Sequence, residues 1–292
     1  MRLHLVDGTY ELFRAHYGRT PPRTAPDGRD VKATVGVVSS LLRLLADPDE
    51  AATHVAIAFD NPIESFRNDL FPDYKSSAGM EPALLAQFDL VERSVAAIGI
   101  TVWSMARWEA DDALATGAVR WADDVEQVRI MTPDKDLGQV VRGQRIVQVD
   151  SMRSRVFDDA GVVARLGVRP ASVPDYLALV GDTADGIPGL TGFGAKSAAI
   201  LLQAYDHLDA IPDDVDDWTV RPRGADRLAQ TLAGSRQDAL LYRQLATLAL
   251  DVPMQESLDD LQWRGAPRAE FEAWATSVGV TSLRDRITRW RD

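Results

Sequence analysis

The sequence of 292 residues contains no cysteine, four histidines and only four lysines. Without cysteine, the chain can form no disulfide, thiolate zinc site or iron–sulfur cluster, and it has no cysteine nucleophile. The histidines are scattered singly, which argues against a zinc site; they are His4, His16, His54 and His207. No apolar run reaches the roughly 18 residues of a membrane span, and the amino terminus lacks the pattern of a signal peptide. We therefore expect a cytoplasmic protein without a membrane partner.

The composition is otherwise that of a globular protein with a sizeable core. Hydrophobic residues make up 46% of the chain and charged residues 26%, which argues against a mainly disordered chain. The length corresponds to about two domains of roughly 150 residues each. The 44 acidic and 32 basic side chains give a net charge of −12. This charge argues only weakly against a nucleic-acid partner, because the local distribution of cations matters more than their sum.

Short apolar runs alternate with longer helical patterns in the first half of the chain. Each run has four or five residues without polar alternation, which is typical of strands buried on both faces of a parallel sheet. The rhythm predicts an α/β fold with a mostly parallel central sheet flanked by helices. The predicted strands span residues 3–6, 55–59, 100–103 and 128–131, and the predicted helices span 31–46, 82–98 and 111–121.

The strand signal stops near residue 158, and helical segments joined by glycine and proline turns follow. We therefore expect an α/β domain over residues 1–165 and a helical domain over residues 166–292. The helices expected in the second domain span residues 173–180, 195–204 and 237–250. Residues 263–291 have apolar and arginine side chains at helical spacing, and packing on the core is favoured there over a nucleic-acid contact.

Aspartates follow the predicted strands. Asp7 comes directly after the first strand and Asp60 directly after the second, while Asp134 and Asp136 follow the strand over 128–131. Ligands of open α/β sheets bind outside the carboxyl ends of the strands. The four carboxylates are therefore predicted to meet at one edge of the sheet.

Two further groups of acids are predicted to reach the same edge. Glu109, Asp111 and Asp112 open the helix that follows the strand over 100–103. Acids that stabilise a helix N-terminus are the alternative for this segment taken alone. Asp182 and Asp185 lie in a later glycine-rich turn, for which a plain acidic turn is the alternative.

Carboxylates within about 5 Å of one another cannot all stay ionised unless cations compensate them. Ligand sets made only of oxygen select hard divalent ions such as Mg²⁺ or Mn²⁺. The number of acids exceeds what one ion needs and indicates two ions, the arrangement that promotes in-line displacement at a phosphodiester. The acids therefore point to phosphoryl hydrolysis.

A glycine-rich turn leads into the predicted helix over 195–204. Gly189, Gly192 and Gly194, followed by Lys196, let backbone N–H groups approach an anion closely at a helix N-terminus. The run nearly matches a nucleotide-binding loop, but Ala195 interrupts it and no strand precedes it, which argues against an ATPase. The pattern favours sequence-independent contact with a DNA backbone, with a plain helix connection as the alternative.

Seven motifs occur in the order and approximate spacing of one known family, and together they make a chance match implausible. The chain resembles the 5′-nuclease family, meaning the 5′→3′ exonuclease domain of bacterial DNA polymerase I and its flap-endonuclease relatives, over about residues 2–250. The motifs are Leu5-Val6-Asp7-Gly8, Phe59-Asp60, Ser65-Phe66-Arg67, Tyr74-Lys75, Glu109-Ala110-Asp111-Asp112, Thr132-Pro133-Asp134-Lys135-Asp136 and Gly181-Asp182-Thr183-Ala184-Asp185-Gly186-Ile187-Pro188-Gly189.

The resemblance implies a PIN-like α/β domain with a helical arch over about residues 66–98. It also implies a helix–three-turn–helix over about residues 173–204 that holds duplex DNA, often with bound K⁺. The implied activity is structure-specific, two-metal hydrolysis of DNA at 5′ ends, 5′ flaps, gaps and nicks, and of RNA primers annealed to DNA. Because no polymerase follows Asp292, we expect a free-standing nuclease, for which polymerase or ligase partners are compatible but unspecified.

The resemblance also implies roles for individual residues. Asp7, Asp60, Glu109 and Asp111 resemble ligands of the first metal, and Asp112, Asp134, Asp136, Asp182 and Asp185 resemble ligands of the second, either directly or through water. Arg67 and Lys75 occupy the positions expected to contact the scissile phosphate. The expected DNA-binding residues are Tyr74, Gly189, Gly192, Gly194 and Lys196. The chain departs from the family after Lys75, where a further basic residue is usual and Ser76 to Gly79 stand instead.

Two other functions compete with this one. One is a PIN-like ribonuclease, a class that is typically much shorter and lacks the helix–three-turn–helix. The other is a nucleic-acid-binding protein with an idle site, which the presence of every expected acid disfavours. Cleavage that depends on Mg²⁺ or Mn²⁺ distinguishes an active nuclease from an idle one.

Overall fold

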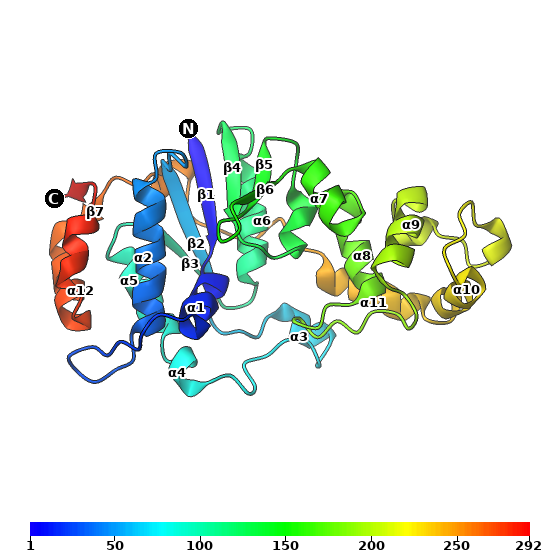
Figure 1. Ribbon diagram of the computed structural model, residues 1–292, viewed down its shortest axis with the longest axis horizontal. Coiled ribbons are helices and arrows are strands. Elements are labelled where there is room, and N and C mark those ends of the chain that lie inside the picture. Colours follow the sequence, from blue (N-terminus) through cyan, green and yellow to red (C-terminus); the bar gives the residue numbers. More distant parts are fainter.

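The four buried apolar runs form neighbouring strands of one sheet, as predicted. A computed structural model describes residues 1–292. The sheet has six strands in the order β3-β2-β1-β4-β5-β6, in which the first five are parallel and β6 is antiparallel to β5 (Figure 1). The strands are β1 Arg2–Asp7, β2 His54–Asp60, β3 Thr101–Met105, β4 Gln127–Met131, β5 Ile146–Asp150 and β6 Arg155–Phe157. The predicted α/β class is therefore confirmed.

Both faces of the sheet are buried, which explains why its strands are apolar without alternation. Val6 and Ile57 pack on one face with side chains of α1, α2, α5 and α12. Leu5 and Ile130 pack on the other face with α6. The helices around the sheet are α1 Gly8–Tyr17, α2 Lys32–Ala46, α5 Phe88–Ala96, α6 Ala110–Trp121, α7 Asp159–Leu166 and α12 Arg268–Val278.

The helix predicted over residues 82–98 is two helices, α4 Pro82–Leu85 and α5. The break falls at Gln87, whose buried amide oxygen accepts hydrogen bonds from the N–H and the hydroxyl of Thr34 on α2, at 3.0 and 3.1 Å. The interior of α5 packs in the core of the α/β part. Of the segment expected as a helical arch, only α3 Phe66–Leu70 has no residue in this core, because Leu84 of α4 is buried in it.

The second half of the chain forms a helical region with its own core, as predicted. Helix α8 spans Val173–Val180, the predicted residues, and a turn over residues 181–194 connects it to α9. Gly189 in this turn has a φ of +69°, and a Cβ there would lie 2.5 Å from the backbone nitrogen of Gly181, so only glycine fits. The other helices of this region are α9 Ala195–Tyr205, α10 Ala225–Gly234 and α11 Arg236–Ala246.

The carboxyl-terminal segment packs on the α/β part of the molecule, although it lies within the residues expected for the helical domain. Helix α12 packs beside α2 and α5, at the opposite end of the molecule from α9 and α10 (Figure 1). The indole N–H of Trp274 donates to the hydroxyl of Ser94 at 2.7 Å, and that of Trp263 donates to the carbonyl of Ile98 at 2.9 Å. The apolar side chains of residues 263–291 therefore pack in the core of the α/β part and not in the core of the helical region.

No helix combines the length and apolar character needed to cross a bilayer.

Candidate active site

The carboxylates that end β1 and β2 are fixed by backbone and hydroxyl donors. Asp7 is the N-cap of α1: its Oδ1 accepts from the N–H of Tyr10 at 2.8 Å, and its Oδ2 accepts from the hydroxyl of Thr132 at 2.9 Å. Thr132 follows β4, so this bond lies where the strand order reverses, the place where open α/β sheets bind ligands. Asp60 accepts from the N–H of Ala110 at 2.7 Å, which ties β2 to the start of α6.

Glu109 precedes α6 and lies among cations and hydroxyl donors. Its Oε2 is 2.6 Å from the ammonium of Lys75 and accepts from the Tyr74 hydroxyl at 3.3 Å. Its Oε1 accepts from the Ser65 hydroxyl at 2.6 Å and lies 3.0 Å from the Arg67 guanidinium. Burial raises the pKa of Glu109, but the two cations outweigh it and hold that pKa below its ordinary value.

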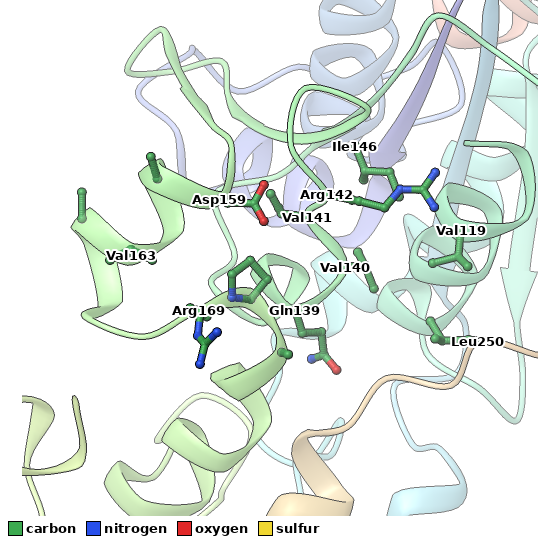
Figure 2. Close-up of a pocket in the computed structure, with 14 residues that line it drawn as sticks. Val119, Gln139, Val140, Val141, Arg142, Ile146, Asp159, Val163, Arg169 and Leu250 are labelled. Carbon is green, nitrogen blue, oxygen red and sulfur yellow. The ribbon is translucent and has the colours of Figure 1, made fainter. Parts of the chain in front are cut away.

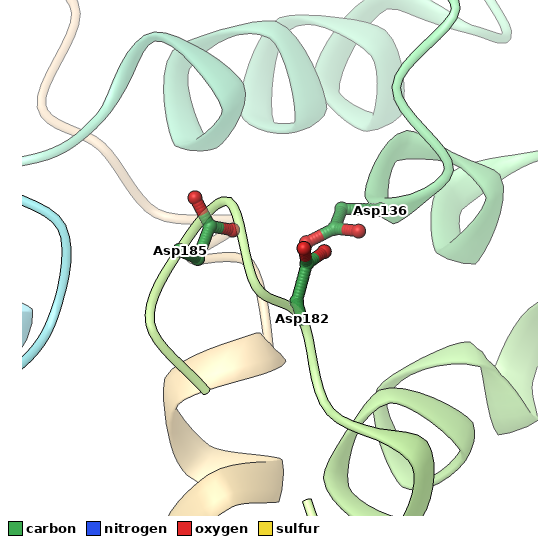
Figure 3. Close-up of side chains that lie close together, drawn as sticks. All are labelled: Asp136, Asp182 and Asp185. Atoms are coloured by element: carbon green, nitrogen blue, oxygen red, sulfur yellow. The ribbon is translucent and has the colours of Figure 1, made fainter. Parts of the chain in front are cut away.

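Three aspartates from two distant parts of the chain meet in a compact cluster (Figure 3). Asp136 lies at the start of the 3₁₀ helix Asp136–Val140, and Asp182 and Asp185 lie in the turn after α8. Each offers a carboxylate oxygen within 4.8 Å of the others. Asp134 is adjacent and accepts from the backbone N–H of Asp136 at 3.1 Å.

Mutual repulsion shows that the two groups of acids form one continuous site. Burial, with repulsion from Asp60 and Asp134, raises the pKa of Asp7 to about 7. Burial and repulsion from Asp7 and Asp134 raise the pKa of Asp111 well above its ordinary range. Burial and repulsion from Asp134 and Asp185 do the same for Asp136. Asp134 therefore repels both a strand-end acid, Asp7, and an acid of the cluster in Figure 3, Asp136, and so connects the two groups.

The structure buries Arg67 and Asp112 and pairs them with each other, which differs from the placement expected for a phosphate contact and a metal ligand. Arg67 is 1% exposed, and its guanidinium makes two bonds of 2.8 Å to the two oxygens of Asp112. It also donates to the carbonyls of Leu245 and Thr247 at 2.7 and 3.0 Å. Asp112 is fully buried and further accepts from the backbone N–H groups of Glu109 and Ala249. The pair is thus an internal salt bridge, with neither a free oxygen for a metal nor a guanidinium for a phosphate.

Tyr74 is also placed differently from the expectation. Only 4% of it is exposed, and its ring packs in the core of the helical region. It therefore orients Glu109 from the interior and offers no surface to DNA. By contrast, Gly192 and Lys196 are exposed, and Gly189 and Gly194 are partly exposed, on the turn and the first residues of α9.

The donor chemistry of the site fits divalent ions. Eight carboxylates gather there against the two ammonium groups of Lys75 and Lys135. The Oδ1 of Asp136 is buried and has no hydrogen-bond partner, and such an oxygen is costly to bury unless a cation or donor reaches it. Hard oxygen ligands without sulfur or clustered histidine suit Mg²⁺ or Mn²⁺. The acids are Asp7, Asp60, Glu109, Asp111, Asp134, Asp136, Asp182 and Asp185.

A large apolar hollow lies away from these acids. A cavity of about 860 Å³ is lined mainly by apolar side chains, among them Val140, Val163 and Leu250 (Figure 2). Its one acid, Asp159, accepts a hydrogen bond from the backbone N–H of Gly143. None of the predicted site residues lines this cavity, so size alone does not locate the candidate site.

The raised pKa values of the site predict a pH-dependent stability without metal. Burial raises the pKa of Asp7 to about 7 and that of Asp185 to about 6, whereas the pKa of both is near 4 in an unfolded chain. Between about pH 4 and 7 the native state therefore binds more protons, and stability falls as the pH rises. In EDTA we expect the melting temperature to drop by roughly 5 °C from about pH 5 to 8, and Mg²⁺ should reduce that drop. A melting temperature that rises over this range in EDTA would contradict the prediction.

Family models account for most of the chain. Residues 2–167 match the 5′→3′ exonuclease N-terminal resolvase-like domain, and residues 168–269 match the 5′→3′ exonuclease C-terminal SAM fold. The chain belongs to the 5′→3′ exonuclease family. The relationship inferred from the seven sequence motifs is confirmed.

Individual relatives agree with this family assignment. The chain is 34% identical to DNA polymerase I of Mycobacterium tuberculosis over 98% of its own length but only 31% of that polymerase, so it spans about a third of the curated relatives it matches. Its fold is similar to that of a bacteriophage T5 5′-exonuclease with divalent metal ions (zinc) bound, with a TM-score of 0.67, 16% identity, and coverage of 95% of this chain and 98% of the other. A T5 flap endonuclease in a pseudo-enzyme–product complex with DNA and metal ions has a TM-score of 0.66 and 19% identity, with 84% and 89% coverage.

Proposed function

We propose that this chain is a structure-specific, divalent-metal-dependent 5′ nuclease. It hydrolyses phosphodiesters of DNA at 5′ ends, 5′ flaps, gaps and nicks. It also hydrolyses the phosphodiesters of RNA primers annealed to DNA. The observation that carries the proposal is the excess of carboxylates at the carboxyl edge of the sheet, completed by Asp182 and Asp185 from the turn after α8. This turn makes the site dependent on the helical region, so substrate binding and catalysis share one structural element.

The chain's own residues divide into two candidate ligand sets. Asp7, Asp60, Glu109 and Asp111 would hold a first ion, and Asp134, Asp136, Asp182 and Asp185 a second. When bound, the ions supply activation of the attacking water and stabilise charge on the leaving oxygen. Asp112 is left out of both sets, because its two oxygens are taken by Arg67 and by backbone donors.

The α/β part up to about residue 165 would carry most of the chemistry, completed by Asp182 and Asp185, and the helical region after it would hold duplex DNA. The exposed Gly192 and Lys196 at the start of α9 support contact with a phosphate backbone. Lysine and backbone N–H groups bind phosphates whatever the base sequence, which suits an enzyme that recognises the shape of its DNA substrate. A bound K⁺ at this turn is supported by the resemblance alone.

Lys75 is the candidate phosphate contact. Its side chain is 19% exposed, and its ammonium lies 2.6 Å from Glu109 and 3.5 Å from Asp185, between the two ligand sets. Burial by itself lowers the pKa of Lys75, but the surrounding carboxylates raise it well above the ordinary value, so the ammonium stays charged. A fixed positive charge at this place can stabilise the charge that develops on a phosphate in the transition state.

Replacing Lys75 by alanine should slow cleavage more than it weakens binding. We expect kcat to fall by about a hundredfold, as for the loss of one preorganised donor, with the dissociation constant for flap DNA within about threefold. Single-turnover kinetics and fluorescence anisotropy measure the two quantities. Lys196→Ala is the matched control, for which binding should weaken and single-turnover cleavage at saturating enzyme should change little. Equal losses in kcat and affinity for Lys75→Ala would make Lys75 an affinity contact only.

The proposed function is tested by cleavage of four labelled substrates: a 5′ flap, a 3′ flap, a single DNA strand and a single RNA strand. Each is incubated in EDTA, in Mg²⁺ and in Mn²⁺. Metal-dependent cleavage at the 5′ flap supports the proposal. Metal-independent cleavage, or attack only from the 3′ end, would refute it. Cleavage of single-stranded RNA alone would favour the ribonuclease alternative.

A further inference from the structure

Lys135 lies beside the second set of acids. It stands between Asp134 and Asp136 in the sequence and directly before the 3₁₀ helix Asp136–Val140. Its ammonium contacts Oδ2 of Asp182 and lies 3.8 Å from Oδ1 of Asp136. The side chain is 30% exposed, so it reaches the cluster from the solvent side and can also leave it.

The two oxygens that face Lys135 are the ones that other groups leave free. The Oδ1 of Asp182 accepts from the backbone N–H of Ala184 at 3.0 Å, which leaves its Oδ2 for a cation. The Oδ1 of Asp136 is buried and has no hydrogen-bond donor within reach. Both belong to carboxylates of the cluster drawn in Figure 3, in which each aspartate offers one oxygen within 4.8 Å of the other two. An ammonium and a divalent ion therefore compete for the same two carboxylates.

We propose that Lys135 is a built-in competitor for the divalent ion at the Asp136–Asp182–Asp185 cluster. Its ammonium neutralises the cluster while metal is absent and leaves it when the ion enters. The ion thus binds with the free energy of its own contacts minus the free energy of the displaced ion pair. This inference rests on the proposed metal site. It adds that the ion pair of Lys135 lowers the affinity of that site for the divalent ion.

A lysine side chain at position 135 suits a cation that has to leave the cluster of aspartates when the metal ion binds. Of 32 basic residues only four are lysine, so arginine is the ordinary cation of this chain. A guanidinium forms planar, two-point contacts with a carboxylate, whereas an ammonium is a hydrated point charge on a flexible stem. Arg67 shows the opposite behaviour: it is buried and holds both oxygens of Asp112. Lys135, by contrast, holds one oxygen of Asp182 and remains partly in water.

The test is a calorimetric titration of the DNA-free chain with Mn²⁺, which does not depend on activity. Replacing Lys135 by methionine should tighten Mn²⁺ binding at the affected site by about tenfold, because an ion pair of this burial competes with roughly that factor. Lys135→Arg keeps the competing charge and should bind Mn²⁺ no more tightly than the unmodified chain. Lys196→Met, which removes an exposed lysine outside the cluster, should leave the isotherm unchanged.

Two further measurements assign the effect to this cluster. Without metal, Lys135→Met should melt at a lower temperature than the unmodified chain, since the cluster loses its cation, and saturating Mn²⁺ should narrow the gap. In an Asp136→Asn background the tenfold gain should largely disappear. Unchanged or weaker Mn²⁺ binding by a folded Lys135→Met variant would overturn the inference while leaving the metal site in place. A chain that binds no Mn²⁺ at all would overturn the proposed function together with it.

Discussion

Replacing Asp7 by asparagine should reduce kcat by at least about a thousandfold, which corresponds to ~4 kcal/mol of transition-state stabilisation. Asparagine keeps the shape of the side chain and its Oδ1 can still accept from the N–H of Tyr10, so α1 keeps its cap. What is lost is one negative charge at the point where β1 and β4 separate. Affinity for flap DNA should stay within about threefold, because backbone contacts made elsewhere dominate affinity.

The same substitution should stabilise the metal-free protein. Asp7 lies among acids that repel it, so removing its charge relieves that repulsion at neutral pH. We expect the melting temperature in EDTA to rise by about 2–5 °C and the gain from added Mn²⁺ to shrink. Asp124→Asn, at an exposed acid beyond the end of α6, is the matched control and should change neither quantity. Normal turnover of Asp7→Asn would remove this residue from the chemistry.

Replacing Arg67 by methionine should lower the free energy of unfolding by about 3–5 kcal/mol, the usual cost of removing one partner of a buried ion pair. The loss leaves the fully buried carboxylate of Asp112 without its cation and the carbonyls of Leu245 and Thr247 without donors. Arg67 lies in the first turn of α3 and Asp112 in the first turn of α6. The two carbonyls belong to the last turn of α11 and to the residue that caps it. Urea unfolding monitored by circular dichroism measures the change.

A matched control separates burial from charge. Arg107 is two-thirds exposed, and its nearest acid is Asp69 at 3.9 Å, so Arg107→Met should cost less than about 1 kcal/mol. The family resemblance implied that Arg67 contacts the scissile phosphate, and that role predicts a different result. If Arg67→Met unfolds like the unmodified chain but loses turnover, the phosphate role is right and the structural role is wrong.

The edge of the sheet could be predicted from the chain because parallel strands have one direction. Apolar runs that end in Asp7 and Asp60 place both carboxylates at the same edge once the strands are known to be parallel. The same rule, applied to residues 146–150, would have found β5 and its terminal Asp150. That acid, however, pairs with Arg153 at 2.9 Å and stays out of the cluster of acids. A strand that ends in an acid therefore predicts that the acid lies at the carboxyl edge of the sheet. It does not predict whether that acid joins the cluster of acids or pairs with a nearby cation.

The sequence by itself determined the α/β class, the helical second half, the family and the edge where the acids gather, because strand direction and motif order are properties of the chain. Only the tertiary structure decided which charges face solvent and which face each other. Arg67 and Asp112 lie 45 residues apart and are both inside a motif, yet they neutralise one another in the interior. Lys135 contacts Asp182, 47 residues away. Burial and pairing depend on what packs around a side chain, and residues distant in the chain supply that packing.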